Sequence, residues 1–278
     1  MSARKGPTIG VFDSGFGGLT VLRALLPRIA GAHYLYLGDT ARLPYGAKSK
    51  ETIARYAVES ARFLEQSGAE FLVIACNTAS ALALDEIRSA VKVPVVGVIE
   101  PGARAAFHAL ASRFSTAPPE PDVLVLATDA TVQSHAYRKE CDALGLRATE
   151  VACPLLVPLV EEGWIDHNVT REVLRIYLEG ALQKCAPQAV LLGCTHYPLI
   201  APAIRRALHE LGCEAAVIDS AEATATAVSA ALAVGEQTTE ADATFECYAT
   251  DSVVKFQRLG SHFLGQPIAE VHHLDLGG

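Results

Sequence analysis

Two cysteines occupy matching positions in the sequence, each between a short apolar run and a polar stretch that starts a predicted helix. Cys76 stands in the segment ACNTAS, and Cys194 stands in the segment GCTHYP. A cysteine at the end of a strand and before the N-terminus of a helix lies in a field that favours the thiolate. The asparagine, threonine and histidine side chains that follow add polar groups beside each sulfur. The sequence therefore predicts two chemically active thiols in equivalent places.

A pair of equivalent thiols suits a reaction in which a proton leaves one face of a carbon atom and another arrives on the opposite face. Racemisation of a carbon acid needs an acid and a base whose roles exchange with the direction of the reaction. An unperturbed thiol has a pKa of about 8.5, so both protonation states are accessible near neutral pH. A nucleophilic cysteine enzyme needs only one thiol, and a redox pair needs its sulfurs about 2 Å apart. We therefore predict racemase chemistry, with a thiol-redox protein as an alternative.

Four of the other cysteines are expected to be structural. The chain has seven cysteines, with no CxxC pair and no cluster of cysteine and histidine at zinc-ligand spacing, which predicts free thiols and no metal site. Free cysteine is usually a small buried hydrophobic residue. That interpretation is sufficient for Cys141, Cys185, Cys213 and Cys247.

Another group of polar residues follows the first apolar run. Asp13 and Ser14 precede the glycine run Gly15–Gly18, which lacks the lysine of a P-loop and the spacing of a dinucleotide-binding fingerprint. We expect a tight turn that brings backbone N–H groups to a carboxylate. Asp13 is predicted to polarise a nearby acid–base group, with a helix N-cap as the alternative. His196 is predicted to be a proton partner of Cys194, with packing at a helix start as the alternative.

The elements that would position these residues alternate between short apolar runs and longer amphipathic stretches, as is typical of an α/β protein with mostly parallel sheets. Strands are expected at Ile9–Phe12, Tyr34–Leu37, Phe71–Ala75, Val95–Val98, Val123–Ala127, Ala148–Ala152, Val190–Gly193 and Ala216–Ile218. Helices are expected at Leu19–Ile29, Lys50–Gln66, Ala79–Val91, Val132–Leu144, Val169–Gln183 and Leu199–Leu211. Ligands bind at the carboxyl ends of strands in such folds, where both cysteines fall.

A weak internal repeat indicates a duplicated unit. The segments TIGVFDSGFGG and AEFLVIACNTAS have counterparts at nearly one offset in DVLVLATDATV and PQAVLLGCTHYP. We predict two pseudo-symmetric α/β domains with the active site in the cleft between them. The first domain is expected to be discontinuous, over residues 1–98 and 216–278, and the second to span residues 99–215. The proline-rich stretch Ser115–Pro121 is expected to be a linker or surface loop, and a short α+β tail is expected after Gly235.

The composition is that of a folded protein with a sizeable core. Half of the 278 residues are hydrophobic, 19% are charged, and the formal net charge is −8. No basic stripe stands out, so direct nucleic-acid binding is not expected. The most apolar stretch, Ala221–Val234, is too short and too polar for a membrane span, and the first residues contain no signal-peptide core. A cytoplasmic protein without a membrane partner is expected.

Six motifs, in order along the chain, carry a resemblance to a known family. The segments GVFDSGFGGLTVL, LGDTARLPYG, ACNTASA, GVIEPG, ACPLLVPLVEEG and GCTHYPLI resemble those of the glutamate racemases, from about Ile9 to the final residues. The resemblance implies two α/β domains that face each other, with the chain returning to the first domain near its end. It also implies an isomerase that converts L-glutamate to D-glutamate, and a product used for peptidoglycan synthesis.

The same resemblance implies roles for individual residues. Cys76 and Cys194 match the two catalytic thiols, of which the first takes the proton from D-glutamate and the second from L-glutamate. Asp13 and His196 match residues that assist the thiols. Substrate contacts are implied for Asp13, Ser14, Tyr45, Gly46, Asn77, Thr78, Thr195 and His196.

Two further assignments from the resemblance stay open. An assisting glutamate falls at Glu161 or Glu162, and the sequence does not choose between them. Contacts from Thr128 and Thr131 are expected, although many relatives have glycine where this chain has Ala127.

The expected partners are the two enantiomers of glutamate and a second copy of the chain, since such enzymes are usually homodimers. No cofactor is predicted, because no lysine marks a strand-end position suited to a pyridoxal Schiff base. A two-cysteine racemase for aspartate is the nearest alternative, because the two substrates differ by one methylene group. A protein that binds in order to regulate a partner is another, since some glutamate racemases also inhibit DNA gyrase.

Overall fold

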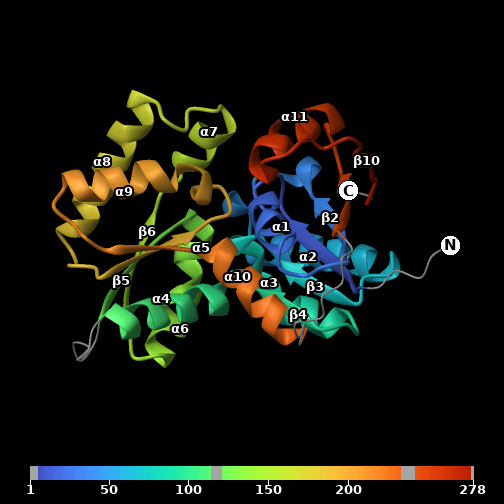
Figure 1. Ribbon diagram of the computed structural model, residues 1–278, viewed down its shortest axis with the longest axis horizontal. Coiled ribbons are helices and arrows are strands. Elements are labelled where there is room, and N and C mark those ends of the chain that lie inside the picture. Colours follow the sequence, from blue (N-terminus) through green and yellow to red (C-terminus); the bar gives the residue numbers. More distant parts are fainter. Residues whose placement is uncertain (1–5, 114–120, 233–241, 277–278) are drawn as a thin grey trace.

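Two parallel β-sheets lie side by side in the computed structural model, which describes residues 6–113, 121–232 and 242–276 (Figure 1). The first sheet has six strands, in the spatial order β10 (His272–His273), β9 (Thr244–Ala249), β2 (His33–Gly38), β1 (Thr8–Asp13), β3 (Phe71–Ile74) and β4 (Val95–Gly97). The second sheet has four, in the order β6 (Arg147–Ala152), β5 (Asp122–Ala127), β7 (Ala189–Gly193) and β8 (Ala216–Asp219). Every strand pair in both sheets is parallel.

Helices cover both sheets. Those associated with the first sheet are α1 (Leu19–Leu25), α2 (Lys50–Gln66), α3 (Asn77–Ala90) and α11 (Val253–Leu264), with 3₁₀ turns η1 (Thr40–Arg42) and η2 (Tyr45–Ala47). Those associated with the second are α5 (Asp129–Ser134), α6 (Ala136–Ala143), α7 (Leu156–Glu161), α8 (Asn168–Leu182) and α9 (Ala201–Glu210), with the turn η3 (Tyr197–Ile200). Two more helices, α4 (Ile99–Arg113) and α10 (Ser220–Ala231), connect the halves.

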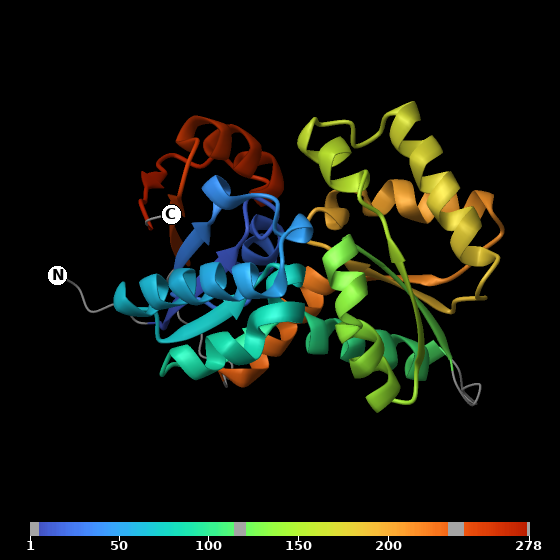
Figure 2. The same cartoon turned by 180° about the vertical axis from the view of Figure 1, so that it is seen from behind.

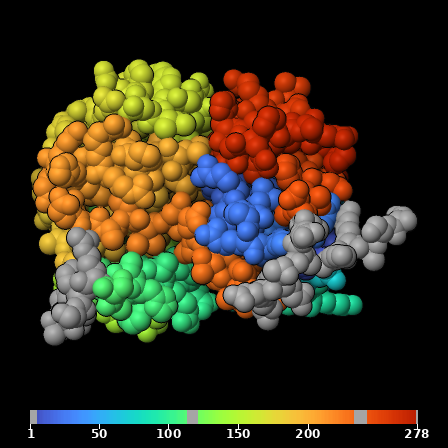
Figure 3. Space-filling model, in the orientation of Figure 1, coloured from blue at the N-terminus to red at the C-terminus, as the bar shows by residue number. Residues whose placement is uncertain are grey.

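The central strands are apolar along their whole length because both faces of each sheet are covered. In β1, the side chains of Ile9 and Val11 join one core, and that of Phe12 joins another on the opposite face. The second of these cores is closed by α2 and α3, which lie side by side over the sheet in Figure 2. The first core continues through α4 into the second sheet, so the two halves share buried apolar packing. Figure 3 shows them in contact along the whole height of one face of the molecule.

The two sheets repeat one topology, which confirms the predicted pseudo-symmetric α/β fold. The order β2-β1-β3-β4 in the first sheet has the same pattern of chain connections as β6-β5-β7-β8 in the second. Cys76 follows β3 and Cys194 follows β7, so the two thiols occupy corresponding strand ends. The repeat seen in the sequence therefore corresponds to a repeat in space.

The helices α4 and α10 pack against each other between the halves. Each follows the last strand of its four-strand unit, β4 or β8, and crosses to the other half. The predicted division put residue 216 in the first domain, but β8 pairs with β7 in the second sheet. The division into domains stays a prediction, and we place its second boundary after Asp219 rather than before Ala216.

All eight expected strands are present, and the helix expected at Lys50–Gln66 has the predicted ends. The helix expected at Val132–Leu144 is broken into α5 and α6 at His135, which has a left-handed backbone (φ 53°). Helices α4, α7 and α10 were not among the expected elements, whereas β9, α11 and β10 form the expected α+β tail after Gly235. Most of the expected linker, residues 115–120, lies outside the described residues. No helix within the described ranges is long and apolar enough to cross a membrane.

Candidate active site

A cavity of about 470 Å³ lies where the carboxyl ends of the two sheets face each other. Both Cys76 and Cys194 line it. Most of the other residues predicted for the site line it too: Ser14, Tyr45, Gly46, Asn77, Thr78, Thr195 and His196. Asp13 does not line the cavity and lies buried behind its wall. The structure thus brings together side chains from opposite halves of the molecule around one space.

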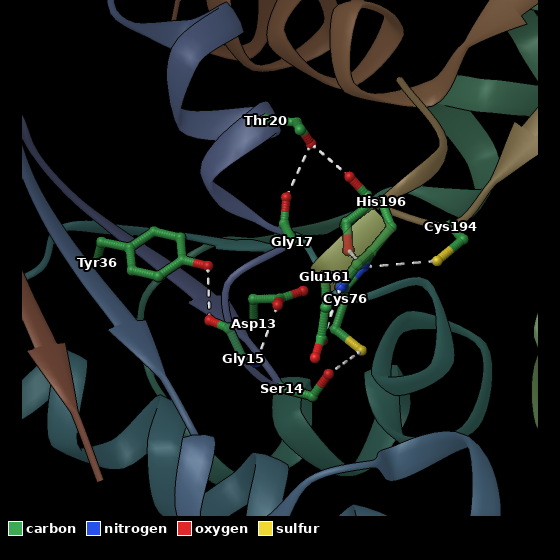
Figure 4. A network of polar contacts seen from close by, with 11 residues as sticks. Asp13, Ser14, Gly15, Gly17, Thr20, Tyr36, Cys76, Glu161, Cys194 and His196 are labelled. Atoms are coloured by element: carbon green, nitrogen blue, oxygen red, sulfur yellow. Dashed lines mark hydrogen bonds and ion pairs between the residues drawn. The ribbon is translucent and has the colours of Figure 1, made fainter. Parts of the chain in front are cut away.

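Cys76 caps the N-terminus of α3, since its sulfur accepts a hydrogen bond from the backbone N–H of Ala79 at 3.5 Å. Its thiol donates to the Ser14 hydroxyl at 3.4 Å (Figure 4). Burial raises the pKa of Cys76 to about 12, and the nearby Asp13 carboxylate adds to the shift, while the contacts with Ser14 and Ala79 oppose it. Cys76 is therefore a neutral thiol near pH 7.

Cys194 has a different set of partners. Its sulfur lies 3.9 Å from Nδ1 of His196, whose Nε2 lies 3.1 Å from Oε1 of Glu161 (Figure 4). Burial alone would lower the pKa of His196, but the contacts with Cys194 and Glu161 outweigh it and raise the pKa to about 10. His196 is therefore an imidazolium near pH 7 and can donate to both neighbours.

Glu161 is the glutamate that contacts this histidine, whereas Glu162 lines the cavity and has no hydrogen bond to His196 among the described residues. Burial would raise the pKa of Glu161, but the hydrogen bond with His196 and the charges of His196 and Lys255 hold the pKa below its usual value. An ionised Glu161 orients the imidazole and keeps it protonated. This contact favours Glu161 as the assisting residue that the sequence left open.

Asp13 is 1% exposed, and its Oδ2 accepts a hydrogen bond from the backbone N–H of Gly15 at 2.9 Å. Its other oxygen, Oδ1, is buried with no hydrogen-bond partner among the described residues. Burial raises the pKa of Asp13, partly opposed by the charge of His196 and by backbone N–H groups. The N-cap alternative is wrong, because Gly18 is the N-cap residue of α1. The predicted turn that brings a backbone N–H group to a carboxylate is present. The donor is Gly15 and the carboxylate is that of Asp13.

The glycine run also touches the second half of the molecule. A Cβ added to Gly17 would lie 2.1 Å from Oγ1 of Thr195 and 2.6 Å from Nδ1 of His196, so any larger residue would have to displace these side chains. The hydroxyl of Thr20 lies within bonding distance of two carbonyl oxygens, 2.9 Å from that of Gly17 and 3.0 Å from that of Thr195 (Figure 4). This contact fixes the loop that carries Cys194 against the first half.

Replacing Gly17 with alanine is expected to lower kcat by roughly 100-fold, because a shift of about 1 Å in a catalytic group can cost that much. Steady-state racemisation assays on the purified variant measure the effect. The matched control is Gly180→Ala, since Gly180 lies within α8 and an added Cβ would meet nothing within 4 Å. That control should keep full activity and gain up to about 1 kcal/mol of stability. Full activity in the Gly17 variant would show that the close approach is not needed.

The raised pKa of His196 predicts a pH-dependent stability. A group whose folded pKa is about 10 and whose ordinary value is 6.5 stabilises the fold fully below pH 6.5 and loses that contribution as the pH rises through 10. The free energy of unfolding of the wild type, minus that of His196→Gln, should therefore shrink between pH 6.5 and 10. Urea titrations across this range measure it, and a constant difference would contradict the assigned charge.

The turn η2 forms another part of the cavity wall. The hydroxyl of Tyr45 donates to Oδ2 of Asp39 at 2.5 Å. Asp39 is fully buried and also accepts bonds from Arg42 and from Thr250, at the end of β9. The loop that carries Tyr45 and Gly46 is thus tied to the C-terminal part of the first half.

Three threonine hydroxyls connect the halves beside the cavity. Thr78, from α3, lies 3.0 Å from Thr128 and 3.2 Å from Thr131, and the last two are 3.0 Å apart. Thr128 lines the cavity, as expected, while Thr131 is fully buried. The hydroxyls of Thr78 and Thr128 are therefore polar groups that a ligand could meet in the cavity, and Thr131 supports them from behind.

Some residues of the site had no signal in the sequence. Asp129 and Lys255 line the cavity, and Lys255 is the one lysine or arginine among the described residues that do so. Lys255 lies on α11, whose sequence has no strand-end motif. Tyr137 bonds to Asn77 and Thr20 bonds to Thr195, both from outside the cavity. Both lie within helices, where a polar side chain in the sequence gives no sign of such a contact. Their roles depend on contacts between distant segments.

Comparison with known proteins agrees with this geometry. The model of the Asp/Glu/Hydantoin racemase family matches residues 9–228. The glutamate racemase of Koribacter versatilis (strain Ellin345) is 48% identical, over 99% of this chain and 100% of its own length. The solved glutamate racemase of Francisella tularensis in complex with D-glutamate has a TM-score of 0.83 at 32% identity and covers 98% of both chains. That of Thermus thermophilus in complex with β-chloro-D-alanine has a TM-score of 0.82 at 42% identity, again over 98% of both chains.

The fold and the site, with a thiol at the corresponding strand end of each half, define an isomerase of the amino-acid racemase class. The chain belongs to the Asp/Glu/Hydantoin racemase family, and within it to the glutamate racemases.

Proposed function

We propose that this protein interconverts L- and D-glutamate by proton transfer between two thiols, without a cofactor. The observation that supports the proposal most directly is that Cys76 and Cys194 line one cavity from corresponding strand ends of two pseudo-symmetric units. Such a pair can supply an acid and a base on opposite sides of a bound carbon atom. The bound D-glutamate in the Francisella tularensis relative supports glutamate as the substrate.

The proposed mechanism begins with one cysteine as thiolate and the other as thiol. The thiolate takes the α-proton, and the opposing thiol delivers a proton to the other face of the same carbon. In the direction that starts from L-glutamate, Cys194 is the base, and the imidazolium of His196 stabilises its thiolate. Cys76 is then the acid, which agrees with its raised pKa and neutral state. In the reverse direction, Asp13 and Ser14 assist the deprotonation of Cys76.

The carbanion formed between the two transfers needs hydrogen-bond donors and a dry environment. The hydroxyls of Thr78 and Thr195 and the amide of Asn77 are polar groups of the cavity wall, and all three residues are less than 10% exposed. Ser14 adds a hydroxyl beside Cys76. We propose that these groups, with Tyr45, Gly46 and His196, hold the ammonium and carboxylate groups of the substrate.

We also propose a use for the product and an oligomeric state for the protein. D-glutamate would supply peptidoglycan synthesis in the cytoplasm, as expected for a glutamate racemase. A homodimer is expected, and sedimentation velocity at micromolar concentration measures it. Within the described residues, no group of three or more histidine, cysteine or acidic side chains could hold a metal ion.

Incubation with L-glutamate in heavy water tests the function directly. Optical rotation should decay to zero while deuterium enters the α-position of the glutamate. Turnover of L-aspartate with none of L-glutamate would assign the enzyme to the alternative substrate. Binding of glutamate without any deuterium at the α-carbon would support a regulatory binding protein instead. A disulfide between Cys76 and Cys194 in the folded protein would support redox chemistry.

A further inference from the structure

Tyr137 lies behind the cavity and touches both loops that carry the cysteines. It is on α6 of the second half and is fully buried. Its hydroxyl donates a hydrogen bond of 2.6 Å to Oδ1 of Asn77, which belongs to the first half and directly follows Cys76. The bond therefore connects the second half of the molecule to the residue beside one thiol.

The ring of Tyr137 packs against the backbone beside the other thiol. A Cβ added to Gly193, which directly precedes Cys194, would lie 3.0 Å from Cε2 of this ring. A Cβ added to Gly102 of α4 would lie 3.3 Å from its Cε1. The ring is thus held between two glycines, and its distance from the end of β7 is fixed by close contact. One side chain meets the neighbours of both sulfurs.

The hydroxyl contact also fixes the orientation of the Asn77 amide. Its oxygen accepts from Tyr137, whereas its nitrogen, Nδ2, is buried with no hydrogen-bond partner among the described residues. Asn77 is 3% exposed and lines the cavity. A buried donor without a partner is costly, and a bound carboxylate would supply the missing acceptor. If the amide turned over, it would present an oxygen to an anion.

We propose that Tyr137 is a positioning residue, which sets the spacing of the two cysteine loops and keeps the Asn77 amide turned so that its N–H₂ group meets a substrate carboxylate. The inference rests on the proposed function, because it gives the free donor of Asn77 a role in binding glutamate. It adds a residue of the second half to the machinery around Cys76. It also explains why a tyrosine, rather than a phenylalanine, fills this buried position.

The variant Tyr137→Phe keeps the ring and removes the hydroxyl. We expect kcat/KM to fall about tenfold, mainly through a higher KM, since loss of a buried hydrogen-bond partner is worth about a factor of ten. Tyr34→Phe is the matched control, because Tyr34 is a fully buried tyrosine whose hydroxyl donates to a backbone carbonyl, that of Leu25, at 3.1 Å. The control should match the wild type in KM. An unchanged KM in Tyr137→Phe would overturn the proposal.

A double-mutant cycle with Asn77→Ala separates positioning from general destabilisation. If Tyr137 acts through Asn77, removing its hydroxyl should have almost no further effect on KM when Asn77 is already alanine. If the same tenfold loss appears in both backgrounds, Tyr137 does not act through the amide and the proposal is wrong. The midpoint of thermal unfolding of each variant shows whether the fold itself is retained.

A measurement without substrate keeps this result distinct from a failure of the proposed function. In ¹⁵N-labelled protein, the side-chain amide signal of Asn77 is identified by its absence from the spectrum of Asn77→Ala. In Tyr137→Phe that signal should shift and its protons should exchange faster with water. An unchanged signal would overturn the proposal even if the wild type racemises glutamate. A changed signal in a protein that does not racemise would contradict only the function.

Discussion

Replacing either Cys76 or Cys194 with alanine is expected to abolish racemisation, with kcat lowered by at least about 1,000-fold. Each substitution removes the thiol that we propose as the acid or base on one face of the substrate. The remaining thiol can still take a proton from one enantiomer and return one to the same face. Cys194→Ala should therefore exchange the α-hydrogen of D-glutamate alone, and Cys76→Ala that of L-glutamate alone. Proton NMR of each enantiomer in heavy water measures both effects.

Cys213→Ala is the matched control for these variants. Cys213 is a partly buried free thiol that does not line the cavity, so its loss should leave kcat and KM unchanged. Circular dichroism and thermal unfolding check that all three variants fold. If either cavity variant interconverts the enantiomers at a rate near that of the wild type, the mechanism with two thiols fails. Exchange of both enantiomers by a single-thiol variant would contradict the assignment of faces.

The second large effect is expected at Asp13, which the sequence identified and the structure places behind the cavity wall. Asp13→Asn keeps the shape and the oxygen that accepts from Gly15, but it removes the negative charge. We expect kcat to fall by roughly 100-fold or more, because an amide can neither accept the proton of Cys76 nor stabilise the imidazolium of His196 by its charge. Initial rates in both directions measure this loss.

The same substitution should raise stability near neutral pH. Burial raises the pKa of Asp13, so ionisation of this group destabilises the fold above its folded pKa and the penalty disappears as the pH falls toward 4. The variant should therefore unfold at a higher urea concentration than the wild type at pH 7, and the gain should diminish at pH 4.5. Asp219→Asn is the control, since Asp219 is also a carboxyl group with a raised pKa but caps α10 away from the cavity. Loss of activity in the control, or its retention in Asp13→Asn, would contradict the assigned role.

Much of the site could be predicted because the carboxyl ends of parallel strands lie at the same edge of a sheet. Cys76, Cys194 and Asp13 each end an apolar run, so the sequence places them at such an edge without any knowledge of contacts. The repeat of these runs also predicts that two edges face each other. Strand boundaries were accurate because strands buried on both faces are continuously apolar.

Other features depend on contacts that no local pattern encodes. The helices α4 and α10 are rich in alanine and pack between the halves, so their sequences lack a clear polar face. The boundary predicted at residue 216 precedes β8, whereas the chain crosses to the first half in α10, after β8 has paired with β7. Tyr137 and Gly17 act through neighbours more than 50 residues away in the chain.

The unlike surroundings of the two sulfurs have a thermodynamic consequence. Mirror-image amino acids have equal free energy in water, so an enzyme that interconverts them must show the same kcat/KM from either side. Cys76 is a neutral thiol beside Ser14, whereas Cys194 lies beside the imidazolium of His196. The complexes with the two enantiomers therefore differ in free energy. The inequality can appear only as a turnover number and a Michaelis constant that differ between enantiomers in one common ratio. Every substitution among these partners must keep kcat/KM equal for the two enantiomers. No variant can therefore raise kcat/KM in one direction alone.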